Sequence, residues 1–123
     1  MTDQLEKWKS SFGDDYTERN KLDDLNIQQR ANLWNAILIH MFGKLPTSAL
    51  EIGAGVGGNL AALSIIYHNL NLPIQLNAIE PNLKAREHLK NVQNTKIIEK
   101  DAFSIDSPNY NFDLSFTCGV LIH

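Results

Sequence analysis

The residues best suited to chemistry lie in the segment 51–59, which reads EIGAGVGGN. Four of the six positions from 53 to 58 are glycine, so much of this backbone can adopt a positive φ and approach a bound group closely. An apolar run precedes the segment and a helical pattern follows it, and backbone N–H groups at a helix start can hold polar or anionic groups. A glycine-rich turn without a ligand is the alternative, although such a turn requires fewer glycines.

Two classes of ligand fit the glycine spacing. Gly53-x-Gly55-x-x-Gly58 matches the dinucleotide-binding fingerprint, whereas Glu51-x-Gly53-x-Gly55-x-Gly57 matches an acidic-glycine signature typical of methyltransferases. Glu51 favours the second class, because a carboxylate at a strand end can face an ammonium or sulfonium cation but repels a pyrophosphate. Pairing of Glu51 with a helix N-terminus or a basic side chain is the alternative. Cofactor contacts are predicted for Glu51, Gly53, Ala54, Gly55 and Asn59.

A second carboxylate, Glu80, ends the next apolar run, 22 positions after Gly58. An acidic residue at this place accepts both ribose hydroxyls in nucleotide-binding folds. Glu80 therefore predicts an adenosine-containing ligand without separating the two classes, and a solvated strand-end charge is the alternative. Pro81 and Leu83 would lie against one face of the adenine, or would pack as an ordinary helix start.

A third group, Asp101, Ala102 and Phe103, follows the third apolar run. The Asp101 carboxylate can accept from the amino group of adenine, the Ala102 N–H can donate to a ring nitrogen, and Phe103 offers an apolar wall. A turn aspartate beside a core phenylalanine is the alternative interpretation.

The fourth apolar run ends at Thr117, Cys118 and Gly119, whose backbone carbonyls could hold an amino group of the ligand. Cys118 fits a small packing residue better than a nucleophile, because no base can be assigned to it. His123 is the one candidate for a general base, with polar surface as the alternative. The four histidines are scattered without metal-ligand spacing, so no metal site is predicted.

Alternating helix and strand patterns must position these residues. Strands are predicted at 49–52, 74–79, 95–99 and 112–117, and helices at 23–42, 57–69 and 82–91. The first helix has an apolar stripe of Ile27, Ala31, Trp34, Leu38 and Met41, and the last places Leu83, Arg86, Leu89 and Val92 on one line. This alternation indicates an α/β fold with a parallel sheet. Such sheets bind ligands at the carboxyl ends of their strands, where the candidate residues fall.

Composition narrows the class of protein. The 123 residues are 43% apolar and 20% charged, as in an ordinary globular domain. A net charge of -3 disfavours a dedicated nucleic-acid binder, and a single cysteine excludes an internal disulfide and suits a reducing cytoplasm. Because no run resembles a signal peptide or a membrane span, we predict a soluble, cytoplasmic protein without a membrane partner.

Taken in order, Glu-x-Gly-x-Gly-x-Gly, the acidic end of the second strand, Asp-Ala-Phe and Phe-Asp-Leu-x-Phe-x-x-Gly-Val-Leu resemble class I S-adenosylmethionine-dependent methyltransferases over residues 47–123. Segments 12–20 and 116–123 also resemble methylases associated with pseudaminic acid biosynthesis. The resemblance implies a Rossmann-like three-layer sandwich with a parallel sheet of order 3-2-1-4. It also implies S-adenosylmethionine as cofactor and a small-molecule or sugar-related methyl acceptor.

The resemblance further assigns roles to individual residues. Glu51, Gly53 and Gly55 would surround the methionine part of the cofactor, with Thr117 and Cys118 beside its amino acid group. Glu80 would bind the ribose, and Asp101 with Ala102 the adenine edge. Residues 1–45 would form a helical N-terminal extension, and residues 46–123 the cofactor-binding domain. Within that extension, Tyr16, Arg19 and Asn20 would close over the cofactor, and a plain linking loop is the alternative.

The family fold has seven strands, whereas four are predicted here. The sequence would then be a truncated copy of a longer protein, or its fourth strand would be an apolar edge that pairs with a second copy or another chain. Two further functions fit the same residues. One is a non-catalytic S-adenosylmethionine-binding or partner-binding module, and the other is an NAD-dependent oxidoreductase.

Overall fold

The computed structural model describes residues 6–7, 9–11, 13–14, 23–41, 44–99 and 111–118. Each helix and strand predicted from residue 23 onward has a counterpart in it. The elements are α3 (Asp24–Ile39), β1 (Ser48–Ile52), α4 (Gly58–Asn69), β2 (Gln75–Ile79), α5 (Leu83–Leu89), β3 (Thr95–Ile97) and β4 (Leu114–Thr117). Several are shorter than predicted, α3 most of all. Its last turn tightens, with His40 N–H donating to the carbonyl of Ile37 and Met41 N–H to that of Leu38.

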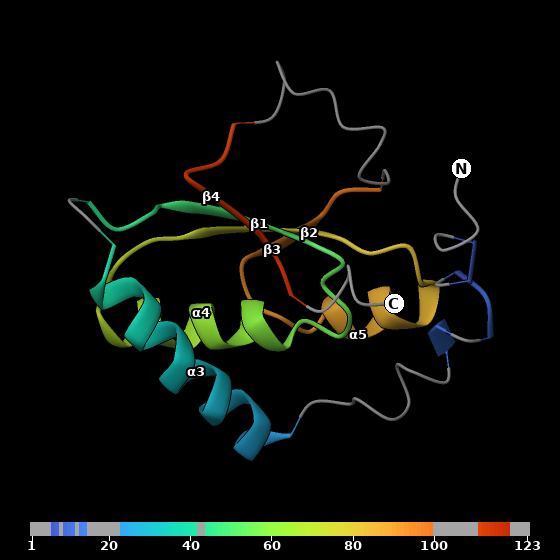
Figure 1. Ribbon diagram of the computed structural model, residues 1–123, viewed down its shortest axis with the longest axis horizontal. Helices are drawn as coiled ribbons and strands as arrows, with labels where there is room; N and C mark the ends of the chain where they lie inside the picture. Colours follow the sequence, from blue (N-terminus) through green and yellow to red (C-terminus); the bar gives the residue numbers. More distant parts are fainter. Residues whose placement is uncertain are drawn as a thin grey trace.

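The four strands form one parallel sheet in the order β3-β2-β1-β4, as the resemblance implies. β1 lies in the centre, and its last residue, Ile52, is paired in register with Ile79 of β2 and Thr117 of β4. The carboxyl ends of these three strands therefore meet at one edge of the sheet (Figure 1). This edge is where a parallel α/β sheet binds its ligands.

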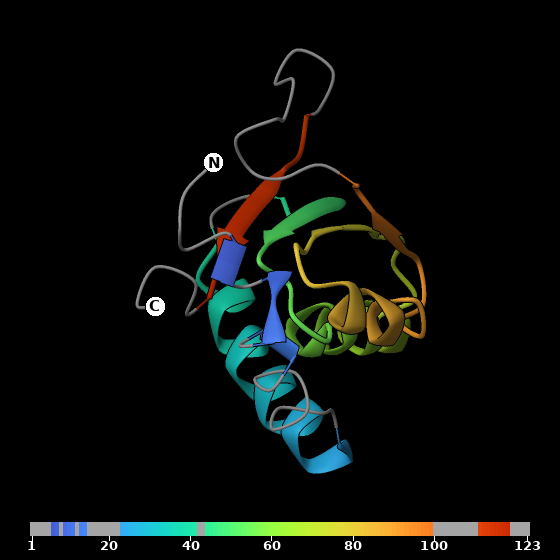
Figure 2. The ribbon, with the colours of Figure 1, turned by 90° about the vertical axis from the view of Figure 1, so that its right-hand side faces the viewer.

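The three described helices α3, α4 and α5 all lie on the same side of the sheet (Figures 1 and 2). α3 packs on α4, and α5 contacts β3. The sheet and this helix layer confirm the Rossmann-like α/β class. None of the helices with described bounds covers the opposite face, and the third layer of the predicted sandwich stays a prediction.

The core between sheet and helices is built from apolar side chains at the predicted periodicity. The α3 stripe is confirmed, since Ala31, Trp34 and Leu38 are buried. The Trp34 ring meets Phe116 of β4 edge to face, with centroids 4.7 Å apart, so α3 also supports the edge strand. None of the helices within the described ranges combines the length and apolar character that crossing a membrane requires.

The predicted apolar line on α5 is wrong at its first residue. Leu83 is 69% exposed, whereas Ala85 and Leu89 are buried. A helix of seven residues buries a single narrow face, and residues four apart share that face. Leu83 stands two residues before Ala85 and therefore projects from the opposite side of the helix.

Candidate functional site

The glycine loop after β1 takes its shape from three alternate glycines. Gly53, Gly55 and Gly57 have φ values of 77°, 59° and 91°, a region that other residues rarely adopt. The N–H groups of Gly53 and Ala54 both donate to the carbonyl of Ile79, at 2.8 and 3.1 Å, which ties the loop to the end of β2. The positions whose backbone requires glycine are therefore those of the spacing Glu-x-Gly-x-Gly-x-Gly. Gly58, the last glycine of the dinucleotide-binding fingerprint, begins α4 and has no positive φ.

The glycines differ in what surrounds them. A methyl group on Gly57 would stand 2.8 Å from Leu89 Cδ2, and one on Gly58 would stand 2.7 Å from Arg30 Nε, so these two glycines permit close packing. A methyl group on Gly55 would meet no atom of the described residues within 4 Å. Gly55 therefore exposes backbone to an open space in which a ligand can approach. Ala54 is buried, and its N–H and carbonyl are both bonded within this region, so it supports the loop.

Glu80 lies directly after β2 and joins the glycine loop to the start of α5. Its Oε1 accepts from the N–H of Gly55 and its Oε2 from the N–H of Asn82, both at 2.7 Å. A carboxylate offers about four acceptor sites, so these bonds leave about two, one for each hydroxyl of a ribose. Burial raises the pKa of Glu80, and the two backbone N–H groups oppose that rise.

Glu51 is more enclosed than sequence reasoning anticipated. Glu51 is only 2% exposed, and its Oε2 accepts from Asn59 Nδ2 at 2.9 Å. Its Oε1 is buried and has no hydrogen-bond partner among the described residues. Burial raises the pKa of Glu51 from 4.5 to about 8, opposed by the Asn59 hydrogen bond and the charge of Arg30. The alternative interpretation, pairing with a basic side chain, is met only indirectly, because Arg30 donates to Asn59 Oδ1 and not to Glu51.

The end of β4 lies beside the glycine loop, since Thr117 is paired in register with Ile52. Cys118 is exposed, so its predicted packing role is wrong. The alternating pattern of β4 ended at the preceding residue, and the sequence carries no signal for the exposure that follows. Asp113 anchors the start of β4, accepting from the N–H of Thr47 at 2.8 Å and from its hydroxyl at 2.9 Å. These two bonds lower the pKa of Asp113.

Asn82 is a site residue that sequence reasoning missed. Its side chain caps α5 by accepting from the N–H of Ala85, and it also donates to Asp14 Oδ1 at 2.7 Å. Its own N–H binds Glu80, so Asn82 connects the N-terminal segment to the candidate ribose-binding carboxylate. An asparagine directly before a helix is a sequence signal for the capping role. No sequence signal indicates its contact with Asp14, which lies 68 positions away.

Several predicted site residues lie outside the described ranges: Tyr16, Arg19, Asn20, Asp101, Ala102, Phe103, Gly119 and His123. Their roles stay predictions. Pro81 is half-buried beside Glu80, and the exposure of Leu83 contradicts the packing alternative for that side chain. Within the ranges that the structure describes, no group of histidine, cysteine, aspartate or glutamate residues could hold a metal ion.

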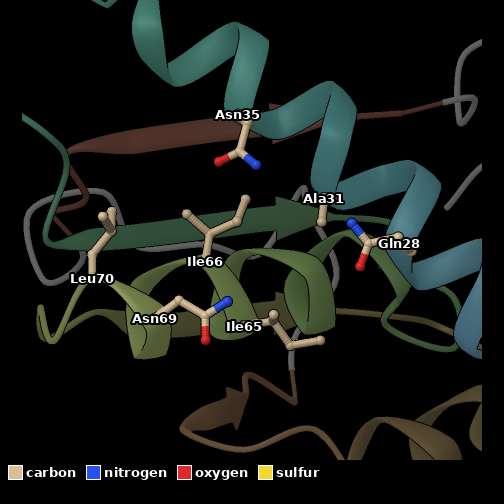
Figure 3. Close-up of a pocket in the computed structure, with 7 residues that line it drawn as sticks. All are labelled: Gln28, Ala31, Asn35, Ile65, Ile66, Asn69 and Leu70. Carbon is tan, nitrogen blue, oxygen red and sulfur yellow. The ribbon is translucent and has the colours of Figure 1, made fainter.

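A separate hollow of about 160 Å³ opens between α3 and α4 (Figure 3). It is lined by Gln28, Ala31, Asn35, Ile65, Ile66, Asn69 and Leu70. None of these side chains is charged, and none belongs to the glycine loop or to the strand ends. This hollow therefore offers no counter-charge for a cationic or anionic ligand.

The strand order and helix arrangement define a Rossmann-like α/β fold. The plantazolicin methyltransferase BpumL in complex with SAH matches with a TM-score of 0.61 and 20% identity, over 93% of this chain and 44% of that one. BamL, a plantazolicin methyltransferase in complex with a triazolic desmethylPZN analog and SAH, matches with a TM-score of 0.55 and 22% identity, over 88% of this chain and 40% of that one. This chain thus spans less than half the length of these enzymes. No protein-family model and no curated protein sequence matches it.

Proposed function

We propose that this chain binds S-adenosylmethionine at the carboxyl ends of β1 and β2 and forms the nucleotide-binding part of a class I methyltransferase. The observation that carries the proposal is the Glu80 carboxylate, which is fixed by the N–H groups of Gly55 and Asn82 and retains acceptor sites for two ribose hydroxyls. The structural neighbours were solved with SAH, the demethylated product of that cofactor, which supports this choice of ligand.

The remaining residues fit such a ligand in charge and space. Gly55 borders open space, and Glu51 carries a buried oxygen without a partner that could receive the ammonium group of the methionine part. Thr117 and Cys118 end the neighbouring strand, within the region expected to hold the amino acid group. The adenine edge would be bound by Asp101 and Ala102, and closure over the cofactor would come from the N-terminal segment.

The cofactor brings an activated methyl group when bound, so the protein's own task is to orient donor and acceptor and to exclude water. A general base is needed only where the acceptor must lose a proton, and His123 is the candidate for that role. We propose a small-molecule acceptor. The resemblance to pseudaminic acid-associated methylases favours a sugar-related one, whereas the structural neighbours are plantazolicin methyltransferases solved in complex with desmethylPZN analogs.

A ribose-binding Glu80 predicts a large loss of affinity when its charge is removed. We expect Glu80→Gln to weaken binding of S-adenosylhomocysteine by about 1.5–3 kcal/mol, or roughly tenfold to a hundredfold, because a charge-assisted bidentate contact is lost. Isothermal titration calorimetry measures this change. The matched control is Glu87→Gln, since Glu87 is exposed and forms a surface ion pair with Lys90. Equal affinities in wild type and Glu80→Gln would refute the ribose assignment.

Two assays separate the competing functions. Competition between NAD and S-adenosylhomocysteine distinguishes a methyltransferase from an NAD-dependent oxidoreductase, and the proposal predicts that NAD displaces nothing. Transfer of a tritiated methyl group to a cell extract distinguishes an enzyme from a non-catalytic binding module. Binding without transfer would favour the module, which would leave the cofactor assignment intact and remove the catalytic one.

A further inference from the structure

The hydrogen-bond partners of Asn59 fix the orientation of its side-chain amide. Arg30 Nη1 and Trp34 Nε1 both donate to Asn59 Oδ1, at 3.1 and 3.2 Å. A carbonyl oxygen has two acceptor sites, so these two donors from α3 fill it. A flipped amide would point its own N–H groups at the two donors. The amide nitrogen is therefore directed at Glu51, to whose Oε2 it donates at 2.9 Å.

The relay, defined here as Arg30, Trp34, Asn59 and Glu51, links α3 and α4 to the end of β1. Arg30 is itself held in place by Asn26 Oδ1, to which its Nε donates at 2.7 Å. The relay ends at Glu51 Oε1, which is buried and accepts no hydrogen bond from the part of the chain that the structure describes. A buried carboxylate oxygen without a partner disfavours the ionised form unless a cation arrives.

Among the described residues, the charged groups that act on Glu51 are Arg30 and Glu80. Arg30 on α3 favours the ionised carboxylate, whereas Glu80 after β2 disfavours it. Asn59 on α4, which donates to Glu51, and Trp34 on α3, which donates to Asn59, are both neutral. Burial outweighs the favourable contributions, and the pKa of Glu51 rises to about 8. The carboxyl group is therefore mainly protonated in the ligand-free protein near neutral pH.

We propose that the relay makes Glu51 a proton-linked receptor for the cationic amino group of the cofactor, with Asn59 and Arg30 as positioning residues. In this step the O–H bond of the neutral carboxyl group breaks, the proton leaves to solvent, and the resulting carboxylate accepts a hydrogen bond from the ligand's ammonium group. The inference rests on the proposed function, because it assigns a mode of binding to the same site. It also makes α3, which precedes the first strand, part of that site.

The first test compares two ligands on the wild-type chain. S-adenosylhomocysteine carries an ammonium group and adenosine does not. We expect the affinity for S-adenosylhomocysteine to rise about tenfold per pH unit below pH 8, and to fall again above about pH 8 as the ligand's own amino group loses its proton. For adenosine, the affinity should not rise with pH below about pH 8. The increase of affinity with pH is called the rising limb below. Calorimetry in two buffers of different ionisation enthalpy should detect release of close to one proton near pH 7 for S-adenosylhomocysteine alone.

The second test moves the rising limb with variants. Glu51→Gln should abolish it. Arg30→Met should shift it to higher pH, because a charge that favours the ionised carboxylate is lost, and Arg30→Lys should restore it. Lys96→Met removes one exposed positive charge from β3, outside the relay, and should leave the limb in place. Thermal unfolding of each variant checks that it is folded.

The outcomes distinguish this inference from the proposed function. If S-adenosylhomocysteine binds with an affinity that does not change between about pH 6 and pH 8, the inference is overturned and the proposed function stands. If the affinity of Arg30→Met for S-adenosylhomocysteine rises over the same pH range as that of the wild type, the role of Arg30 is overturned. If neither adenosine nor S-adenosylhomocysteine binds, the proposed function fails and the inference fails with it.

Discussion

At the end of β1, the three glycines with positive φ serve two different purposes. Gly57 lies against α5, where an added methyl group would stand 2.8 Å from Leu89 Cδ2 and 2.9 Å from Val92 Cγ2. Gly55 borders open space. The same residue type thus serves tight packing at one position and access for a ligand at the other, and sequence spacing alone does not separate these purposes.

Alanine substitutions should separate them. Gly55→Ala should destabilise the protein by about 1–2 kcal/mol, from backbone strain alone. Gly57→Ala should destabilise it by roughly 2–5 kcal/mol, because overpacking against Leu89 adds to the strain. Urea unfolding measures both values. Binding of S-adenosylhomocysteine should be weakened by Gly55→Ala beyond what its stability change explains, and a Gly55→Ala protein with wild-type affinity would contradict a ligand at this position.

At the scale of the element, the C-terminus of α4 has a Schellman motif formed by asparagine. Asn71 has a φ of 56°, its N–H donates to the carbonyl of His68, and the N–H of Leu72 donates to that of Tyr67. This stop separates α4 from β2 and sets where the second strand begins. Sequence reasoning found the break near residues 69–73, although an asparagine alone does not specify the left-handed conformation.

Substitutions at Asn71 should rank by their tolerance of positive φ. Asn71→Gly should match or exceed the wild-type stability, whereas Asn71→Ala should be less stable than Asn71→Gly by about 1 kcal/mol. Thermal unfolding of the three proteins measures the order. Asn69→Ala, on the last turn of α4 before the motif, is the control for a lost surface amide. An alanine variant as stable as the glycine variant would contradict the motif's role.

At the scale of the whole molecule, Glu51 makes folding stability depend on pH. Its pKa is about 8 in the folded chain and 4.5 ordinarily, so between these values the folded state holds one more proton than the unfolded state. The free energy of unfolding therefore falls as pH rises through this window. Its favourable contribution is complete below pH 4.5 and is lost by about pH 8.

The variant Glu51→Gln removes this dependence. We expect its stability advantage over wild type to grow between about pH 5 and pH 8, by at most about 1.4 kcal/mol per pH unit. Urea unfolding at a series of pH values measures the difference, and Glu87→Gln on the surface of α5 serves as the control. Parallel pH profiles for wild type and Glu51→Gln would show that Glu51 ionises as readily in the folded chain as in the unfolded one.

The exposed edge of β4 bears on whether the chain associates with a second copy. β4 pairs with β1 on one side, and no described strand lies on its other side. We expect this edge to pair with a second copy, giving a concentration-dependent mass above the 13.9 kDa of one chain. Ser115→Lys should shift the mass toward the monomer, because charge on an edge strand opposes pairing. Light scattering coupled to gel filtration measures the mass, and a wild-type monomer at every concentration would contradict the expectation.

The sequence by itself determined the alternation of helices and strands, the glycine loop after the first strand and the acidic residue after the second. These are local patterns, because the period of apolar residues and the conformational freedom of glycine belong to single elements. The same reasoning was wrong for Leu83 and Cys118, since burial near an element end depends on which neighbour covers it.

Only the tertiary structure decided the partners of Glu51 and Asn82. The Asn59 amide is oriented by donors on α3, and Asn82 meets Asp14 from 68 positions away. The open space at Gly55 was equally hidden in the sequence. A side chain's partners depend on how helices and strands pack together, and periodicity within one element carries no information about that packing.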